Sequence, residues 1–269
     1  MDYRPLGRTG ERIPVIGMGT YSLGNSTGER RAEEIKAIQR GIELGMTLID
    51  TAEVYGNGRS ETLVGQAIAD SRDQVFLATK VAPEHFSYDE VIRSCDASLA
   101  RLGVKFVDLY QLHWPSPRIP IQETMKAMEE LVATGKTRYI GVSNFSVEQT
   151  MSAQESLPRS ELASNQVRYS ITSRSIEADL LPFCEREKIT IIAYSPLDTG
   201  SIPVSRIPKD LLEKYELTPA QMMLNWVIRP EGVMTIPKAA KVSHVEENAR
   251  AADILISQAD YQALSKRFE

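Results

Sequence analysis

The sequence has little cysteine, little histidine and no excess of positive charge, and each scarcity excludes a class of function. A net charge of −5 predicts no basic surface of the kind that binds nucleic acid. The three histidines, His85, His113 and His244, lack metal-ligand spacing, so we expect no metal site. The two cysteines, Cys95 and Cys184, lie in helical patterns and are expected to be reduced and packed.

Long apolar runs are also missing. None approaches the roughly 20 residues that span a bilayer, and residues 1–14 contain no apolar segment typical of a signal peptide. We therefore expect a cytoplasmic protein without a membrane partner, and a monomer. Its composition, 42% hydrophobic and 25% charged residues, is typical of globular proteins.

What the sequence does contain is a regular alternation of short apolar runs with longer amphipathic stretches. Such runs, rich in Val, Ile and Leu, are typical of buried parallel strands. The eight predicted strands are Val15–Gly19, Thr47–Asp50, Val75–Lys80, Val107–Leu112, Arg138–Val142, Ala163–Gln166, Thr190–Tyr194 and Gly232–Ile236. A turn at Gly7–Gly10 between residues 3–6 and 12–14 predicts a hairpin before them. We expect one α/β domain over residues 1–269, a (β/α)8 TIM barrel with an N-terminal β-hairpin.

Several helix starts are marked by a hydroxyl residue followed three positions later by Glu or Gln. This capping-box pattern occurs at Ser87, Ser146, Thr218 and Ser243.

An open, doubly wound sheet is the alternative fold. Residues 17–22 come near the dinucleotide-binding glycine fingerprint, but Ser22 stands at the third glycine position and no acidic residue follows at the expected distance. Residues 135–137 similarly resemble the end of a Walker A loop, but Glu130 occupies its first glycine position. We reject both nucleotide motifs and favour the barrel.

Four polar residues stand at or just after the ends of predicted strands: Asp50, Tyr55, Lys80 and His113. Each alone has an ordinary explanation as a helix cap, a surface residue or a hydrogen-bonded core residue. In a barrel, however, the carboxyl ends of the strands surround one pocket. A lysine there needs a partner for its charge, and Asp50 on the neighbouring strand is the nearest candidate.

The sequence resembles the aldo-keto reductase family over nearly its whole length. The matching segments occur in the family's order, and they are residues 48–56, 78–81, 107–114, 141–145, 165–167, 193–197 and 236–238. The resemblance implies a (β/α)8 barrel behind a hairpin. It also implies reduction of small aldehydes and ketones to alcohols with NAD(P)H.

For the reaction, the resemblance implies that Tyr55 donates a proton to the developing alkoxide. Free tyrosine titrates near about 10, and we expect Lys80 to lower this pKa while Asp50 keeps the lysine charged. His113 would hydrogen-bond the carbonyl oxygen.

The resemblance also assigns the cofactor contacts. Ser143, Asn144 and Gln166 would hold the nicotinamide carboxamide, and Tyr194 would stack on the ring. The other assigned positions are Gly19, Thr20, Ser195, Leu197, Ile236, Lys238, Ala239, His244, Glu247 and Asn248.

Two of these positions depart from the commonest pattern. Ala239 stands where a serine often binds the 2′-phosphate of NADP, and His244 stands where an arginine often does. The helix start at Ser243, with Lys238 and Lys241 nearby, is still suited to a phosphate. We favour NADP(H) and leave NAD(H) or dual use open.

The loop over residues 114–119 is shorter than in family members with narrow pockets. The resemblance therefore implies an open substrate pocket, bordered by Tyr21 and Trp114. Two other functions stay open. One is a Schiff-base aldolase that uses Lys80, and the other is a nucleotide-sensing subunit without catalysis.

Overall fold

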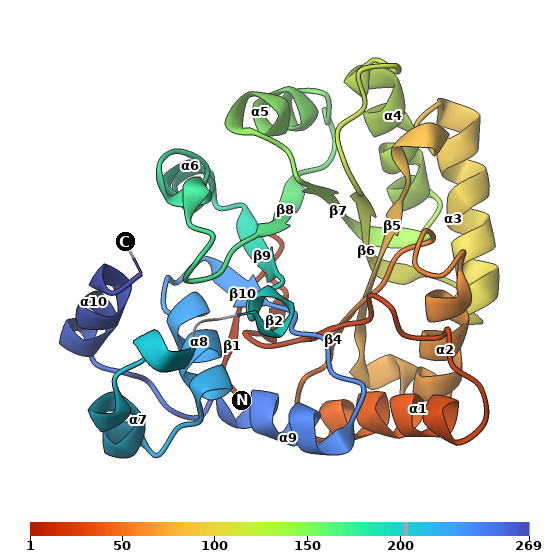
Figure 1. The fold of residues 1–269 in the computed structure, drawn as a ribbon. Coiled ribbons are helices and arrows are strands. Elements are labelled where there is room, and N and C mark those ends of the chain that lie inside the picture. The colour runs from red at the N-terminus through yellow and green to blue at the C-terminus, as the bar shows by residue number, and fades with distance from the viewer. Residues whose placement is uncertain (202–203, 269) are drawn as a thin grey trace.

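Eight parallel strands form a barrel that helices surround (Figure 1) in the computed structural model, which describes residues 1–201 and 204–268. The strands pair in chain order, from β3 at one edge of the sheet to β10 at the other. Their bounds are β3 Met18–Gly19, β4 Leu48–Asp50, β5 Phe76–Val81, β6 Val107–Leu112, β7 Thr137–Ser143, β8 Leu162–Arg168, β9 Thr190–Tyr194 and β10 Val233–Thr235. The predicted barrel is confirmed.

The two edge strands meet along a seam that closes the barrel. Isolated parallel bridges join Ile16 to Thr235 and Gly19 to Lys238. A Cβ atom on Gly19 would lie 2.7 Å from the carbonyl oxygen of Ile236, so only glycine allows the two backbones to approach this closely. The strand predicted over Val15–Gly19 is therefore shorter in the structure, because Val15 and Ile16 reach β10 through single contacts rather than a ladder.

The helices cover the outside of the barrel, and their starts test the capping predictions. Ser146 and Thr218 form complete capping boxes with Gln149 and Gln221. Ser87 precedes its helix as predicted, but its hydroxyl lies 2.5 Å from the carboxylate of Glu90 and caps no backbone N–H.

The remaining helix-start prediction, at Ser243, is wrong. The helix α9 begins at Val242, because the backbone N–H of Val245 already donates to the carbonyl of Lys241 at 3.1 Å. Ser243 therefore lies inside the first turn.

The helix bounds complete the description. The α-helices are α1 Gly28–Glu43, α2 Arg59–Ile68, α3 Tyr88–Leu102, α4 Ile121–Ala133, α5 Val147–Glu155, α6 Leu180–Glu187, α7 Lys209–Tyr215, α8 Pro219–Val227, α9 Val242–Arg250 and α10 Gln258–Lys266. Short 3-10 turns lie at Arg72–Gln74, Pro83–His85, Ser175–Glu177, Asp198–Gly200 and Val204–Arg206. Among the described helices, none is long and apolar enough to cross a membrane.

The predicted hairpin is present and closes the amino-terminal end of the barrel. Strands β1 (Tyr3–Pro5) and β2 (Arg12–Pro14) pair antiparallel, with Tyr3 opposite Pro14. Leu6 and Ile13 pack inside the barrel against residues near the starts of the strands. Arg4 donates to the carbonyls of Ile228 and Pro230 at 2.7 and 2.8 Å. The carboxyl ends of the strands are left as the open mouth.

Side-chain alternation decides what points into the barrel. Leu48, Ala78 and Leu109 belong to the interior cluster, whereas their neighbours Ile49, Leu77 and Tyr110 pack outward under the helices. Two residues further along these three strands, the inward positions are polar and are occupied by Asp50, Lys80 and Gln111. The two cysteines are free and buried as predicted, and burial raises the pKa of each thiol to about 12.

Candidate active site

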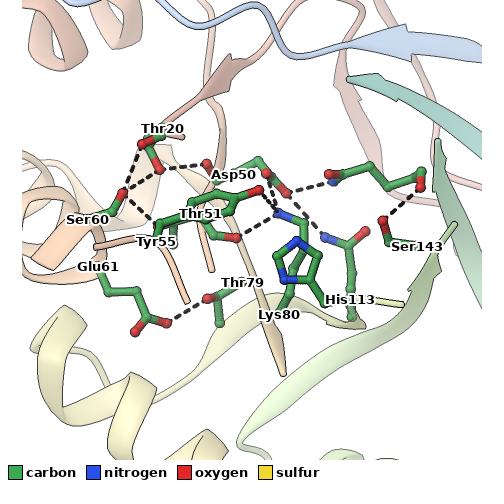
Figure 2. Close-up of polar contacts among 12 residues, drawn as sticks. Thr20, Asp50, Thr51, Tyr55, Ser60, Glu61, Thr79, Lys80, His113 and Ser143 are labelled. Carbon is green, nitrogen blue, oxygen red and sulfur yellow. Dashed lines mark hydrogen bonds and ion pairs between the residues drawn. The ribbon is translucent and has the colours of Figure 1, made fainter. Parts of the chain in front are cut away.

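A layer of polar side chains lies directly above the apolar interior, at the mouth of the barrel. Asp50, Lys80, Gln111 and Gln166 come from four strands, β4, β5, β6 and β8, and all four are buried. Lys80, Gln111 and Gln166 each donate a hydrogen bond to the Asp50 carboxylate, and Figure 2 shows Lys80 beside Asp50. Of these, the predicted catalytic pair Asp50 and Lys80 is brought into direct contact.

Lys80 is fully buried, and its ammonium group is hydrogen-bonded within the protein. Its Nζ atom donates to Asp50 Oδ2 at 2.5 Å and to the carbonyl of Thr51 at 2.8 Å. Burial alone would lower the pKa of Lys80, but its interactions with Asp50 and Tyr55 together outweigh burial, and the net pKa is raised. Lys80 is therefore an ammonium ion at neutral pH, and this protonation state disfavours the Schiff-base alternative.

Tyr55 lies in the loop between β4 and α2, and its hydroxyl is 3.4 Å from Lys80 Nζ. Burial raises the pKa of Tyr55, the charge of Lys80 lowers it, and the net pKa is raised. The expected sign of the lysine's effect is confirmed, but the expected net lowering is wrong because loss of hydration is the larger influence. The phenol consequently keeps its proton at neutral pH, which is the form that a proton donor requires.

His113 follows the end of β6, with its ring 5.6 Å from the Tyr55 ring, centroid to centroid. Burial first, and then the charge of Lys80, lower the pKa of His113 to about 2. The imidazole is therefore neutral in the physiological range, so one of its nitrogens carries hydrogen and can donate while the other accepts. All four predicted catalytic residues thus meet at the mouth.

The three polar residues predicted to hold a carboxamide also lie together. Ser143 at the end of β7 donates to the carbonyl of Gln166 at 2.8 Å, and Asn144 Nδ2 donates to Ser143 Oγ at 3.0 Å. Asn144 has a φ of 62°, a left-handed conformation that asparagine tolerates better than most residues. The hydroxyl of Tyr194 donates to Asn144 Oδ1 at 2.9 Å, which fixes the half-buried tyrosine ring beside this group.

The positions predicted for the rest of the cofactor lie around the seam and the β9 loop. Gly19 ends β3 and Thr20 follows it; Thr20 is buried, and its hydroxyl donates to the carbonyl of Asp50 at 3.0 Å. Ser195 and Leu197 follow β9, and Ile236 follows β10.

Beyond the seam, Lys238 and His244 are exposed, and the first turn of α9 contains no acidic residue. Ala239 is half-buried nearby. Asn248 is buried, and Glu247 Oε1 accepts a hydrogen bond from Thr218 at 2.7 Å, so this carboxylate is already tied to the start of α8.

The predicted rim residues are exposed beside two of the predicted catalytic residues, Tyr55 and His113. The ring of Tyr21 is 5.3 Å from the Tyr55 ring, and Trp114 stacks on His113 with a centroid distance of 3.7 Å. Tyr21 is 67% exposed and Trp114 43%, which makes this rim accessible to a ligand.

Two features of the mouth were missed by the sequence reasoning. Gln111 donates to Asp50 Oδ1 at 3.3 Å. Glu53 accepts from the backbone of Ala82 at 2.7 Å and contacts His85 Nδ1 at 2.9 Å, which links the Tyr55 loop to the loop after β5. The alternation along residues 107–112 could have revealed Gln111, since it places this side chain on the same face as Leu109.

Residues 15–267 match the model of the aldo/keto reductase family. The chain belongs to this family. It is 39% identical over 261 residues to methylglyoxal reductase YeaE of Escherichia coli strain K12, a match that covers 95% of this chain and 91% of that protein.

Two solved structures are closely similar to this aldo/keto reductase. The thermostable aldo-keto reductase Tm1743, solved with the inhibitor epalrestat, has a TM-score of 0.94 at 39% identity, covering 99% of this chain and 100% of that one. An aldo/keto reductase of Klebsiella pneumoniae, solved with NADP and acetate, has a TM-score of 0.91 at 39% identity, covering 100% and 96%. The agreement extends over the barrel and its loops, so the enzyme is an oxidoreductase of this type.

Proposed function

We propose that this aldo/keto reductase reduces small aldehydes and ketones, methylglyoxal among them, with NADPH. The observation that carries the proposal is the protonated Tyr55 phenol beside a buried, charged Lys80, with its hydroxyl 3.4 Å from Nζ at the open end of the barrel. The assignment of methylglyoxal draws support from the similarity to YeaE.

The residues present fit a phosphorylated dinucleotide. The hydroxyl of Tyr194 is held by Asn144, so a face of the tyrosine ring is oriented for stacking on the nicotinamide. The exposed cations Lys238 and Lys241 and the exposed imidazole of His244 lie at or near a helix start that contains no acidic residue in its first turn. The Klebsiella relative solved with NADP supports the phosphorylated form. When bound, NADPH supplies the hydride that reduces the substrate carbonyl carbon.

The protein's own residues then manage the oxygen. His113, neutral in the physiological range, donates a hydrogen bond to the carbonyl oxygen and orients it. Tyr55 transfers its phenolic proton to the same oxygen as negative charge develops there. Lys80 stabilises the phenolate that remains, and Asp50, 2.5 Å away, keeps the lysine charged and directed.

Replacing Tyr55 with phenylalanine tests this assignment. The variant should lose reduction of methylglyoxal while NADPH affinity, measured by fluorescence titration, stays nearly unchanged. Tyr139→Phe is the matched control, because its hydroxyl lies 3.4 Å from Glu11 at the hairpin end of the barrel. Loss of both binding and turnover in Tyr55→Phe would contradict the proton-donor role.

The wild-type protein decides the broader question. Titration with NADPH and NADH separately measures the cofactor preference, and turnover of methylglyoxal against a steroid ketone measures the size of the pocket. Binding of NADPH without turnover of any small carbonyl would favour the nucleotide-sensing alternative. A strict preference for the steroid would contradict the open pocket.

A further inference from the structure

Gln111 is a fully buried amide on β6 that contacts the carboxylate of Asp50. In the parallel register it lies directly beside Lys80. Its Nε2 donates to Asp50 Oδ1 at 3.3 Å, and Gln166 donates to the same oxygen at 2.8 Å, whereas Lys80 occupies Oδ2 at 2.5 Å. Each oxygen of Asp50 therefore has its own donors. The amide must present nitrogen rather than oxygen, because an ionised carboxylate only accepts hydrogen bonds.

The neighbouring strand leaves room for this contact. Gly141 is the β7 residue paired with Gln111, and a Cβ atom there would lie 2.9 Å from Gln111 Cγ and 2.6 Å from Ser164 Oγ. Any larger residue would displace the Gln111 side chain. Ser164 itself is buried on β8, and its hydroxyl has no hydrogen-bond partner among residues 1–201 and 204–268.

We propose that Gln111 is a positioning residue for catalysis that acts through Asp50. By holding Oδ1, it keeps Oδ2 turned toward Lys80 and so keeps the ammonium beside Tyr55. The inference rests on the proposed function, since it presumes that Tyr55 is the proton donor.

The electrostatic surroundings of Gln111 are simple enough to test. The titratable groups of this site are Asp50 on β4, which Gln111 contacts, Lys80 beside it on β5, Tyr55 in the loop between β4 and α2, and His113 after β6. Strands β7 and β8 contribute Gly141, Ser164 and Gln166, which do not titrate. A change at position 111 therefore acts mainly on Asp50.

Two variants distinguish positioning from packing. Gln111→Leu removes the donor, and we expect kcat to fall about tenfold, the usual cost of losing a hydrogen bond to a charged group. Affinity for NADPH should change less than about twofold, because the cofactor contacts are untouched. Thr137→Ala is the matched control, since it removes a buried hydroxyl that donates to the carbonyl of Tyr139 at 3.0 Å, at a β7 position that pairs with Val107 rather than Gln111; its kcat should equal that of the wild type.

Gln111→Glu supplies a readout that packing would not move. The variant has the same shape, and its protonated form can donate to Asp50, whereas its ionised form repels Asp50. We therefore expect its kcat relative to wild type to be higher at about pH 6 than at about pH 9, with activity above that of Gln111→Leu only at the acidic end.

Failure of this inference and failure of the proposed function give different results. A Gln111→Leu enzyme with kcat within about twofold of wild type overturns the inference. So does a Gln111→Glu enzyme whose loss is the same at every pH, and this second test decides the matter should Gln111→Leu fail to fold. A wild-type protein that reduces no carbonyl defeats the proposed function instead, which keeps the two failures apart.

Discussion

Replacing Lys80 with methionine tests the electrostatics on which the catalytic group depends. Lys80 is fully buried, and its Nζ lies 2.5 Å from Asp50 Oδ2. At that separation, an effective dielectric constant of about 20 gives an attraction of roughly 7 kcal/mol. Burial of each ion costs several kcal/mol, so the intact pair contributes little net stability. Removing the lysine alone, however, leaves a buried carboxylate unpaired, which typically costs about 3–5 kcal/mol.

Thermal unfolding measures this cost directly. At about 2–4 °C per kcal/mol for a protein of this size, the Tm of Lys80→Met should fall by roughly 6–20 °C. The double variant Asp50→Leu with Lys80→Met should recover most of that loss, because no unpaired charge remains. Neither variant should reduce methylglyoxal. Stability and activity would thus separate in the double variant.

A surface pair provides the control. Lys136 Nζ lies 2.6 Å from Asp96 Oδ1, and both side chains are partly exposed. Lys136→Met should therefore cost no more than about 1 kcal/mol. If Lys80→Met melted within the same range as this control, the idea of a charged, mutually dependent pair at the barrel mouth would be refuted.

Three further predictions concern the cofactor site, the helix starts and acid stability. His244→Arg should tighten NADPH binding about tenfold without changing NADH binding, because a guanidinium binds phosphate at two points; equal shifts in fluorescence titrations with both cofactors would contradict a 2′-phosphate contact. In urea unfolding, Ser146→Ala should cost about 1 kcal/mol, whereas Ser243→Ala should change stability by less than about 0.5 kcal/mol, and equal losses would contradict the α9 start at Val242. Burial opposes ionisation of Asp198, but hydrogen bonds from Thr172, Arg168 and Ser170 outweigh it and lower the pKa of this carboxyl. The stabilising effect of ionised Asp198 is therefore present above about pH 4 and is lost as pH falls. The difference in unfolding free energy between wild type and Asp198→Asn should shrink toward about pH 3. A difference that stays constant with pH would contradict this sign.

The strands and the four candidate catalytic residues could be predicted from the sequence, because both are visible as patterns of neighbouring residues. Val107–Leu112 and Thr190–Tyr194 were predicted to the residue, since buried parallel strands are short apolar runs. Asp50 and Lys80 could be singled out as candidate catalytic residues because they end such runs.

Other features depend on neighbours that are distant in the chain. The length of β3 depends on how β10 meets it, which no pattern in residues 15–19 contains. The net pKa of Tyr55 depends on how fully the surrounding side chains exclude water. Gln111 escaped notice because a single amide within an apolar run shows its role only when Asp50, 61 residues away, is brought beside it.

The seam between β3 and β10 has a consequence for the motions of the barrel. It is held by isolated bridges at Ile16 and Gly19, whereas the ladder between β5 and β6 pairs four residues on each strand. Backbone amides along the seam, such as those of Gly17 and Thr235, should therefore exchange with deuterated solvent sooner than amides of the central strands. Lys238 lies on one side of this seam and Thr20 follows the other. A ligand that contacts both would hold the two sides of the seam together. Slower hydrogen exchange at Gly17 and Thr235 would then report ligand binding without any chemical turnover.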